Sequence, residues 1–434
     1  MDEIDRALDT LDEETATTAR PVVESLLGHD DTRVPLATLT QSDVQHFLWQ
    51  TLPTRWMTED REHHEIAWAL GDFLQAAGLD RYAEICRDPR THTILSAWHE
   101  EPEKGAAAAY AAAQDSGLVP PDTDALTFGE VMGGDEARIH ADVTRLLERS
   151  IRDGTLDPSA RGFRSRAGRL VEAHLTTPSM SYDGRSPVAV VHEERMGMWV
   201  HQLARGRQRP WTSVVPLVID PVPLPEGAEL SLAPAVAVLE AVGEGVTLTS
   251  AGYLPAKLAI ALDDRFGWSD QMIGATPRSE SDLPRLMFLD QHLRDTRLLT
   301  RRAKRLTVSA EGRRCLADPA RLWSVLTAAD PRQKGFEADA LAVGAAVLLT
   351  SEPVSREELD GEVAAALANK WRAADGTTVI AGDVTAIGVE WYRRGLPLGW
   401  WEESRRRYRL ELTPVGQAAA ANLFRSVATR PMRR

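Results

Sequence analysis

The sequence predicts a mainly α-helical protein, with a helical N-terminal domain and two C-terminal domains that each combine helices with a small β-hairpin. One observation is a basic segment at 294–316, RDTRLLTRRAKRLTVSAEGRRCL, which has the pattern of a helix end, a hairpin and a new helix. A second is the return of this pattern at 392–420, YRRGLPLGWWEESRRRYRLELTPVGQAAA. Strand, helix, loop, helix and hairpin in this order are typical of winged helices. We therefore expect two winged-helix-like domains in tandem.

The two expected hairpins end alike. Their last strands align without gaps at an offset of 104 residues, which pairs Leu306 with Leu410, Val308 with Leu412, Ser309 with Thr413, and Gly312 with Gly416. This offset is longer than the period of solenoid repeats, so duplicated domains explain it better than stacked units. We assign the two winged-helix-like domains to residues 229–329 and 330–428.

The N-terminal part reads as acidic and helical. Residues 1–35 form an acidic segment in which only 21–27 favours a short helix. A helical domain at 36–118 follows, where Thr40 or Ser42 can cap a helix whose apolar residues recur at helical spacing.

The middle region, 119–228, is mixed. The β-branched runs 188–191 and 214–219 favour short extended segments on either side of a helix. The proline-rich stretch IDPVPLPEG then has the composition of a linker to the first winged-helix-like domain.

Composition and charge limit the classes of function. The chain has 434 residues, 43% of them hydrophobic and 26% charged, which is typical of a globular protein with several domains. The net charge is −14, and residues 1–150 alone carry −18. Because this acidic part repels phosphate, any contact with nucleic acid has to come from later in the chain.

The cysteines and the apolar runs indicate the compartment. Cys86 and Cys315 are the only cysteines, too few for a disulfide framework. No run approaches 18 apolar residues, and the acidic start MDEIDRALDTLDEE is the reverse of a signal peptide. We expect a cytoplasmic protein without a membrane partner. The sequence indicates no oligomeric state.

No pattern of catalytic or metal-binding residues stands out. The pair Gly133-Gly134 lacks the Lys-Ser/Thr of a phosphate loop, and no GxSxG or HExxH occurs. The histidines around His63-His64 and at His92 and His99, with Cys86 nearby, match no zinc spacing and favour a structural role. We expect no catalytic residue, no metal and no cofactor, and thus a binding protein rather than an enzyme.

The basic hairpins are the candidate site. Arginine side chains on a hairpin can contact the phosphates of double-stranded DNA. The candidate DNA-binding residues are Arg297, Arg301, Arg302, Lys304 and Arg305 in the first hairpin and Arg405, Arg406, Arg407 and Arg409 in the second.

Three alternatives stay open, the third being an enzyme with a site in the middle region. The arginines could be solvated or pair with the acidic N-terminal domain, and the two domains could form a scaffold that binds a protein partner. The helix before the first hairpin carries Asp282, Asp290 and Asp295, which weighs against DNA contact. The tryptophans beside the hairpins, Trp323, Trp391, Trp400 and Trp401, favour core packing over stacking on bases.

One family resemblance adds to this reading. The segment LTSAGYLPAKLAIAL at 248–262, the segment at 280–323 and the LTxxG-type hairpin exits are similar to the C-terminal region of uncharacterised bacterial, actinobacterial-type proteins. Some of these carry a plasmid open-reading-frame-three-like domain. The resemblance covers roughly residues 230–325 and implies a winged-helix-like region, with no established reaction to carry over. We therefore expect a DNA-associated or regulatory binding protein.

Overall fold

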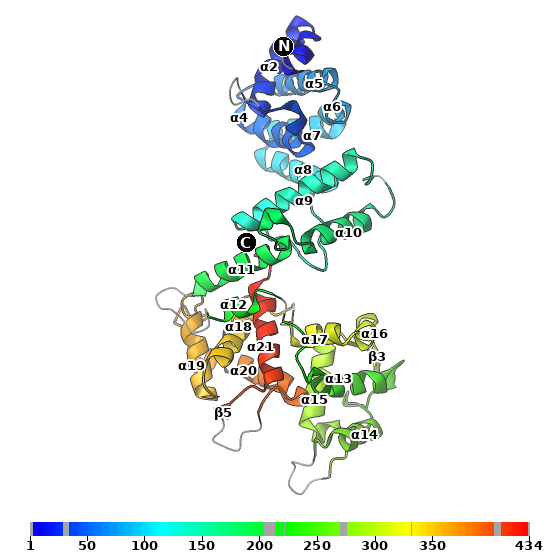
Figure 1. Cartoon of the computed structure of the whole chain (residues 1–434), viewed down its shortest axis with the longest axis vertical. Helices are drawn as coiled ribbons and strands as arrows, with labels where there is room; N and C mark the ends of the chain where they lie inside the picture. The colour runs from blue at the N-terminus through cyan, green and yellow to red at the C-terminus, as the bar shows by residue number, and fades with distance from the viewer. Residues whose placement is uncertain are drawn as a thin grey trace. The chain divides into compact units, whose positions relative to one another are not determined.

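The computed structural model describes residues 3–28, 34–158, 160–203, 213–220, 222–269, 276–330, 332–402 and 409–432. The described chain is mainly α-helical with small antiparallel sheets, which confirms the predicted fold class. It divides into two compact units, labelled by element in Figure 1. The N-terminal unit comprises Met1–Phe128 and Gly134–Val188, and the C-terminal unit comprises Gly129–Gly133 and Ala189–Arg434.

The N-terminal unit is built from helices. Its principal helices are α1 (Glu3–Asp9), α2 (Glu13–Leu27), α3 (Gln41–His46), α4 (Leu52–Arg55), α5 (Asp60–Ala76), α6 (Asp80–Arg87), α7 (Pro89–Glu100), α8 (Pro102–Asp115), α9 (Gly134–Arg152) and α10 (Phe163–Thr176). A short π-helical turn, η3 (Phe47–Thr51), joins α3 to α4. Leu48, Leu70 and Phe73 lie in the centre of the hydrophobic core.

Residues 1–35 are more ordered than the acidic composition indicated. Two helices, α1 and α2, cover much of this segment and pack against α5. Ile4, Leu8, Val22 and Val23 are buried in the same core as α5. The acidic residues occupy the opposite, solvated faces, so few apolar residues at helical spacing are enough to fix both helices.

The two β-branched runs of the middle region are helical. Residues 188–191 belong to α11 (Pro187–Leu203), and 214–219 contain α12 (Val215–Val218). Val214 and Val218 are fully buried one helical turn apart in the core of the C-terminal unit. A short apolar run becomes a strand only if a partner strand is available, and here packing against helices decides instead.

The C-terminal unit contains two halves with a similar order of elements, although the second half has β5 alone where the first has β2 and β3. The first half has α13 (Ala228–Val242), β1 (Val246–Thr247), α14 (Ala256–Phe266), η6 (Glu280–Asp282), α15 (Pro284–Asp295), β2 (Leu299–Arg302), β3 (Arg305–Val308), α16 (Ala310–Ala317) and α17 (Pro319–Thr327). The second has α18 (Gly335–Thr350), β4 (Val354–Ser355), α19 (Arg356–Leu367), α20 (Ala381–Gly395), η7 (Leu396–Leu398), β5 (Arg409–Leu410) and α21 (Pro414–Ala428).

Corresponding residues of the two halves occupy equivalent positions in the two small sheets. In the first half the strand order is β1-β3-β2, and Leu306 on β3 lies opposite Val246 on β1. In the second half Leu410 on β5 lies opposite Val354 on β4. The offset of 104 residues therefore relates positions that occupy the same place in the two ladders. The helix α21 packs against α17, α18 and α12, so the two halves share one hydrophobic core.

A close approach to a backbone carbonyl explains the glycine in the first turn of the helix that follows each hairpin. Ser309 and Thr413 cap the following helix, and their side-chain oxygens accept from the N–H groups of Gly312 at 2.9 Å and Gly416 at 3.0 Å. A Cβ atom at either glycine would lie within 3.0 Å of a backbone carbonyl oxygen, that of Leu298 or of Trp400. Only glycine fits these positions without displacing the hairpin.

Replacing either glycine should therefore destabilise the C-terminal unit. We expect Gly312→Ala and Gly416→Ala each to lower the free energy of unfolding by about 1–3 kcal/mol, the usual cost of overpacking. Urea unfolding followed by circular dichroism measures this. The control is Gly361→Ala in α19, where an added Cβ meets nothing within 4 Å and should stabilise by about 0.5–1 kcal/mol. Equal stability of all three variants would contradict the close-approach argument.

Candidate nucleic-acid interface

The first basic hairpin is a short two-stranded ribbon with one apolar and one charged side. β2 and β3 pair from Leu299 opposite Val308 to Arg302 opposite Arg305. Ala303 and Lys304 form the turn, and Ala303 has a left-handed backbone, φ 53°. Leu299, Leu306 and Val308 are buried, so the hairpin is fixed to the core by one face.

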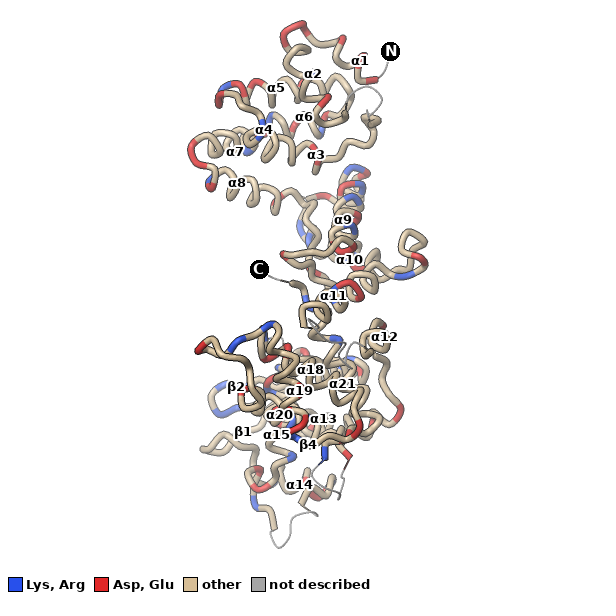
Figure 2. Tube along the Cα trace, turned by 90° about the vertical axis from the view of Figure 1, so that its left-hand side faces the viewer, with Lys and Arg blue, Asp and Glu red and all other residues tan. Residues whose placement is uncertain are grey.

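The cations of this hairpin lie on its solvent side. Arg297, Arg301, Arg302, Lys304 and Arg305 are all exposed. Figure 2 shows basic positions gathered beside β2. Within the described part of the chain, none of the five forms an ion pair with a carboxylate. The positive charge of the hairpin is therefore available to an outside anion, whereas many other arginines of the C-terminal unit are paired.

Two of the nine candidate residues, Arg305 and Arg409, make equivalent hydrogen bonds, one in each half of the C-terminal unit. The guanidinium of Arg305 donates to the carbonyl oxygen of Glu244 at 3.0 Å, and that of Arg409 donates to the carbonyl oxygen of Pro353. Each bond attaches the last strand to the segment that leads into the first strand. Arg409 also lies 3.5 Å from the Glu358 carboxylate.

The remaining candidates differ in how firmly they are held. Arg301 Nε donates to the Ala303 carbonyl oxygen at 2.9 Å, across the hairpin turn. Arg297, Arg302 and Lys304 make no side-chain hydrogen bond within the described chain and are the least constrained. Arg405, Arg406 and Arg407 lie outside the described residues.

The helix that precedes the hairpin does not present an acidic surface. Asp290 is 4% exposed and forms an ion pair with Arg294. Asp282 lies before α15, where its carboxylate accepts from the N–H groups of Arg278 and Ser279. Asp295 lies 3.4 Å from Arg332. The acidic residues of this segment thus form bonds within the fold. The number of acidic residues in the sequence therefore does not give the charge of the surface that could contact DNA.

The same helix packs against its counterpart from the second half. α15 packs against α20 and η7, and the Arg393 guanidinium lies 5.2 Å from the ring centre of Phe288. His292 is 2% exposed, and its Nε2 lies 2.9 Å from the Leu326 carbonyl oxygen. Burial, followed by the nearby charge of Arg394, lowers the pKa of His292 to about 3, so the ring is neutral near pH 7. α15 and α20 therefore each use part of their surface to contact the other half.

The tryptophans beside the hairpins are part of the core, as the sequence indicated. Trp323, Trp391, Trp400 and Trp401 are between 1% and 8% exposed. The rings of Trp391 and Trp401 meet edge to face at 5.0 Å. They are not placed to stack on nucleic-acid bases.

The histidines of the N-terminal unit form a small cluster. His64 Nδ1 lies 2.7 Å from His92 Nδ1, and the His92 ring stacks on both His64 and Trp68. Burial, with the adjacent His64, lowers the pKa of His92. Among the residues that the structure describes, no group of three or more His, Cys, Asp or Glu side chains is placed to hold a metal ion. Nor is any helix among them long and apolar enough to cross a membrane.

Comparisons with protein-family models, with curated proteins and with solved structures found no match to this chain. The resemblance to actinobacterial-type proteins therefore stays a prediction.

A buried carboxyl pair lies behind the hairpin. Glu280 is 1% exposed, and its Oε2 accepts from the Leu254 N–H at 2.5 Å. Burial raises the pKa of its neighbour Asp290 as well, and the ion pair of Asp290 with Arg294 opposes this rise. Burial, followed by the charge of Asp290, raises the pKa of Glu280 to about 7. Glu280 is therefore the member of the pair that holds a proton at mildly acidic pH.

This raised pKa makes stability depend on pH. Below pH 4.5, the ordinary value, Glu280 is protonated in both the folded and the unfolded chain. Between pH 4.5 and about 7 the unfolded chain loses this proton while the folded chain keeps it. The contribution of Glu280 to the free energy of unfolding therefore falls as pH rises.

Glu280→Gln mimics the protonated form and should remove this fall. At pH 8 we expect the variant to be about 1–3 kcal/mol more stable than the wild type, because a tenfold change in proton affinity corresponds to about 1.4 kcal/mol. At pH 4.5 the two should differ little. Urea unfolding at both pH values measures the difference. The exposed Glu362→Gln in α19 is the control, and an equal pH dependence of wild type and Glu280→Gln would refute the assignment.

Proposed function

We propose that this protein is a cytoplasmic, DNA-associated protein whose β2–β3 hairpin contacts the phosphates of double-stranded DNA. The observation that carries the proposal is a group of exposed cations without a carboxylate partner in the described chain, four on the β2–β3 hairpin and the fifth, Arg297, just before it. In a chain with a net charge of −14, such a group is a local exception. Phosphates are the anions that closely spaced arginines bind most readily.

The mode of contact follows from what surrounds the hairpin. Reading of base edges usually requires a helix in the major groove. The helix in the corresponding position, α15, is packed against α20, and the tryptophans are buried. The hairpin is left to contact backbone phosphates, which fix position and carry no sequence information by themselves. We therefore expect binding that depends strongly on salt and weakly on DNA sequence.

A scaffold that binds a protein partner is the second candidate. The packing of α15 against α20 favours it, because both helices already use part of their surface for contact with protein. In this case the cations of the hairpin would bind an acidic protein surface, and DNA would not be the partner.

Salt dependence of DNA binding separates the two candidates. We expect wild-type affinity for a 20-base-pair duplex to fall steeply between 50 and 200 mM salt, with a slope of about −0.9 for each phosphate contacted. The variant Arg297/Arg302/Lys304→Ala removes three cations that make no side-chain hydrogen bond in the described fold. Its slope should be shallower by up to about 2.7. Fluorescence anisotropy of labelled duplexes of two unrelated sequences measures both effects.

A matched control uses the N-terminal unit. Arg161/Arg164/Arg166→Ala removes the same charge from exposed positions at the start of α10 and should leave the slope unchanged. The same titration with Arg405/Arg406/Arg407→Ala tests the second hairpin. Absence of binding at 50 mM salt, or an equal loss in the α10 control, would reject hairpin binding to DNA and favour the scaffold.

A further inference from the structure

Two buried carboxyl groups and two arginines meet behind the basic hairpin. Glu280 of η6 and Asp290 of α15 are 1% and 4% exposed. The Glu280 Oε2 accepts from the Leu254 N–H at 2.5 Å, in the turn between β1 and α14. Asp290 forms an ion pair with Arg294, whose guanidinium also donates to the Gly252 carbonyl oxygen at 3.4 Å. The turn is therefore held by a carboxyl group at Leu254 and by an arginine at Gly252.

One cation of the hairpin belongs to the same cluster. The Arg301 Nη1 lies 3.1 Å from the position that a Cβ on Gly252 would occupy, so its guanidinium contacts the same turn as that of Arg294. Burial raises the pKa of Asp290, and the charges of Arg294 and of Arg301 oppose this rise. The Arg301 side chain is nevertheless exposed. It can therefore interact both with the buried carboxyl groups and with an anion outside.

The neighbouring helix α14 adds no charged group to this cluster in the described chain. η6 packs against α14 and α15. On α15, Asp290 and Arg294 are the charged side chains that act most strongly on Glu280. On α14, the buried Asp263 accepts from the Ser269 N–H at 2.8 Å. The other charged residues of α14 are exposed, namely Lys257, Asp264 and Arg265.

Protons control the charge of the cluster. Burial, followed by the charge of Asp290, raises the pKa of Glu280 to about 7. Each proton that the two carboxyl groups lose as pH rises adds one negative charge beside the guanidiniums of Arg294 and Arg301. In buried surroundings such a charge acts strongly on its neighbours, because water screens it less. The Arg301 guanidinium then has a nearby carboxylate to interact with, and it attracts an outside phosphate less.

We propose that the Glu280–Asp290 pair is a proton-controlled regulator of phosphate binding by the hairpin, and that it acts through Arg301. This proposal rests on the proposed function, the contact of the hairpin with DNA. While the pair holds a proton, the two guanidiniums exceed the negative charge beside them, and Arg301 is available to a phosphate. Once both carboxyl groups have lost their protons, the charges balance. DNA binding is thus tighter at mildly acidic than at mildly alkaline pH.

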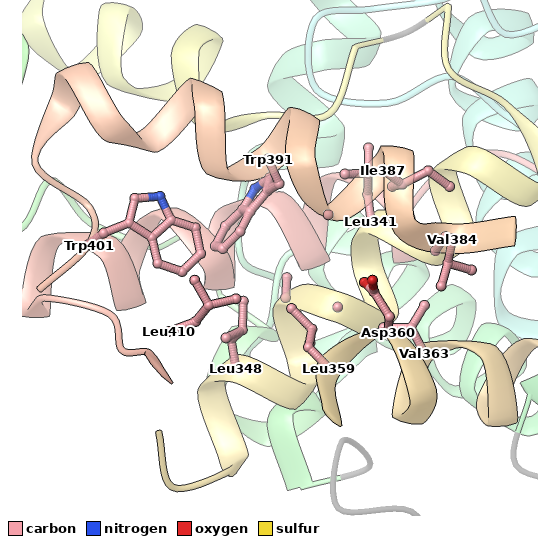
Figure 3. A pocket seen from close by; sticks show the side chains of 14 residues that line it. Leu341, Leu348, Leu359, Asp360, Val363, Val384, Ile387, Trp391, Trp401 and Leu410 are labelled. Atoms are coloured by element: carbon pink, nitrogen blue, oxygen red, sulfur yellow. The ribbon is translucent and has the colours of Figure 1, made fainter. Parts of the chain in front are cut away.

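The second half of the C-terminal unit has a buried carboxylate in a different setting. Figure 3 shows Asp360 of α19 beside a small pocket whose other lining residues, among those described, are uncharged. Asp360 is 6% exposed, and its Oδ2 accepts from the Thr385 hydroxyl of α20 at 2.9 Å. The Arg356 Nε of α19 lies 3.8 Å from the same oxygen. Asp360 is a matched control, because the partners of its carboxylate in the described chain lie on α19 and α20.

The pH dependence of DNA affinity tests the proposal. The Kd of the full chain for a labelled 20-base-pair duplex is measured by fluorescence anisotropy at pH 6 and pH 8, at one salt concentration. We expect the ratio of Kd at pH 8 to Kd at pH 6 to be at least about threefold larger in the wild type than in Glu280→Gln, which mimics the protonated form. Asp360→Asn should keep the wild-type ratio. Circular dichroism confirms that each protein is folded at both pH values.

Two arginine variants show whether Arg301 carries the effect. Arg301→Gln removes the cation that contacts the turn, so its ratio of Kd values should fall to that of Glu280→Gln. Arg302→Gln removes the next cation of β2, and it should weaken binding but keep the wild-type ratio. A wild-type ratio in Glu280→Gln or in Arg301→Gln overturns the proposal, while DNA binding itself stands. Absence of binding at both pH values rejects the DNA contact, and this proposal with it.

Discussion

The packing of α21 against α18 and α17 is the interaction on which the C-terminal unit depends. This helix of the second half contacts α17 of the first half, and so joins the two halves into one core. α15 and α20 add a second contact between the halves. They use part of their surface for it, whereas the cations of the basic hairpin stay exposed.

Polar groups strengthen this junction. The segment between the halves is held from both sides, because Arg332 bonds to Asp295 at the end of α15 and Gln333 donates to Glu390 of α20 at 3.0 Å. Arg430 donates to the carbonyl oxygens of Ala329 and Asp330. A buried charge is tolerated only when its bonds are complete. The junction meets this condition with backbone carbonyls as well as carboxylates.

The exposed and the buried charges of this unit differ in physical character. The hairpin is exposed and rich in positive charge, so its attraction for an anion acts over a long range and is weakened by salt. The carboxyl groups of Glu280 and Asp290 are buried, and they act at short range in surroundings where water competes less.

Local patterns in the sequence were sufficient for the fold class and for the ends of the hairpins. Ser309 with Gly312 and Thr413 with Gly416 act over three residues, and alternation along a strand predicts which residues face the core. The helices of residues 1–35 and the helical state of 188–191 and 214–219 depended on burial against distant segments, where tertiary packing overrides the preference of a short run. For the candidate nucleic-acid interface, the sequence was enough to name the basic residues.

Only the tertiary structure showed that Arg305 and Arg409 bond to the carbonyl oxygens of distant residues, that Asp290 is buried beside Glu280, and that α15 packs against α20. Spacing along a sequence records contacts within a few residues, whereas the burial of a charge and the shape of a cavity are set by residues many tens of positions apart.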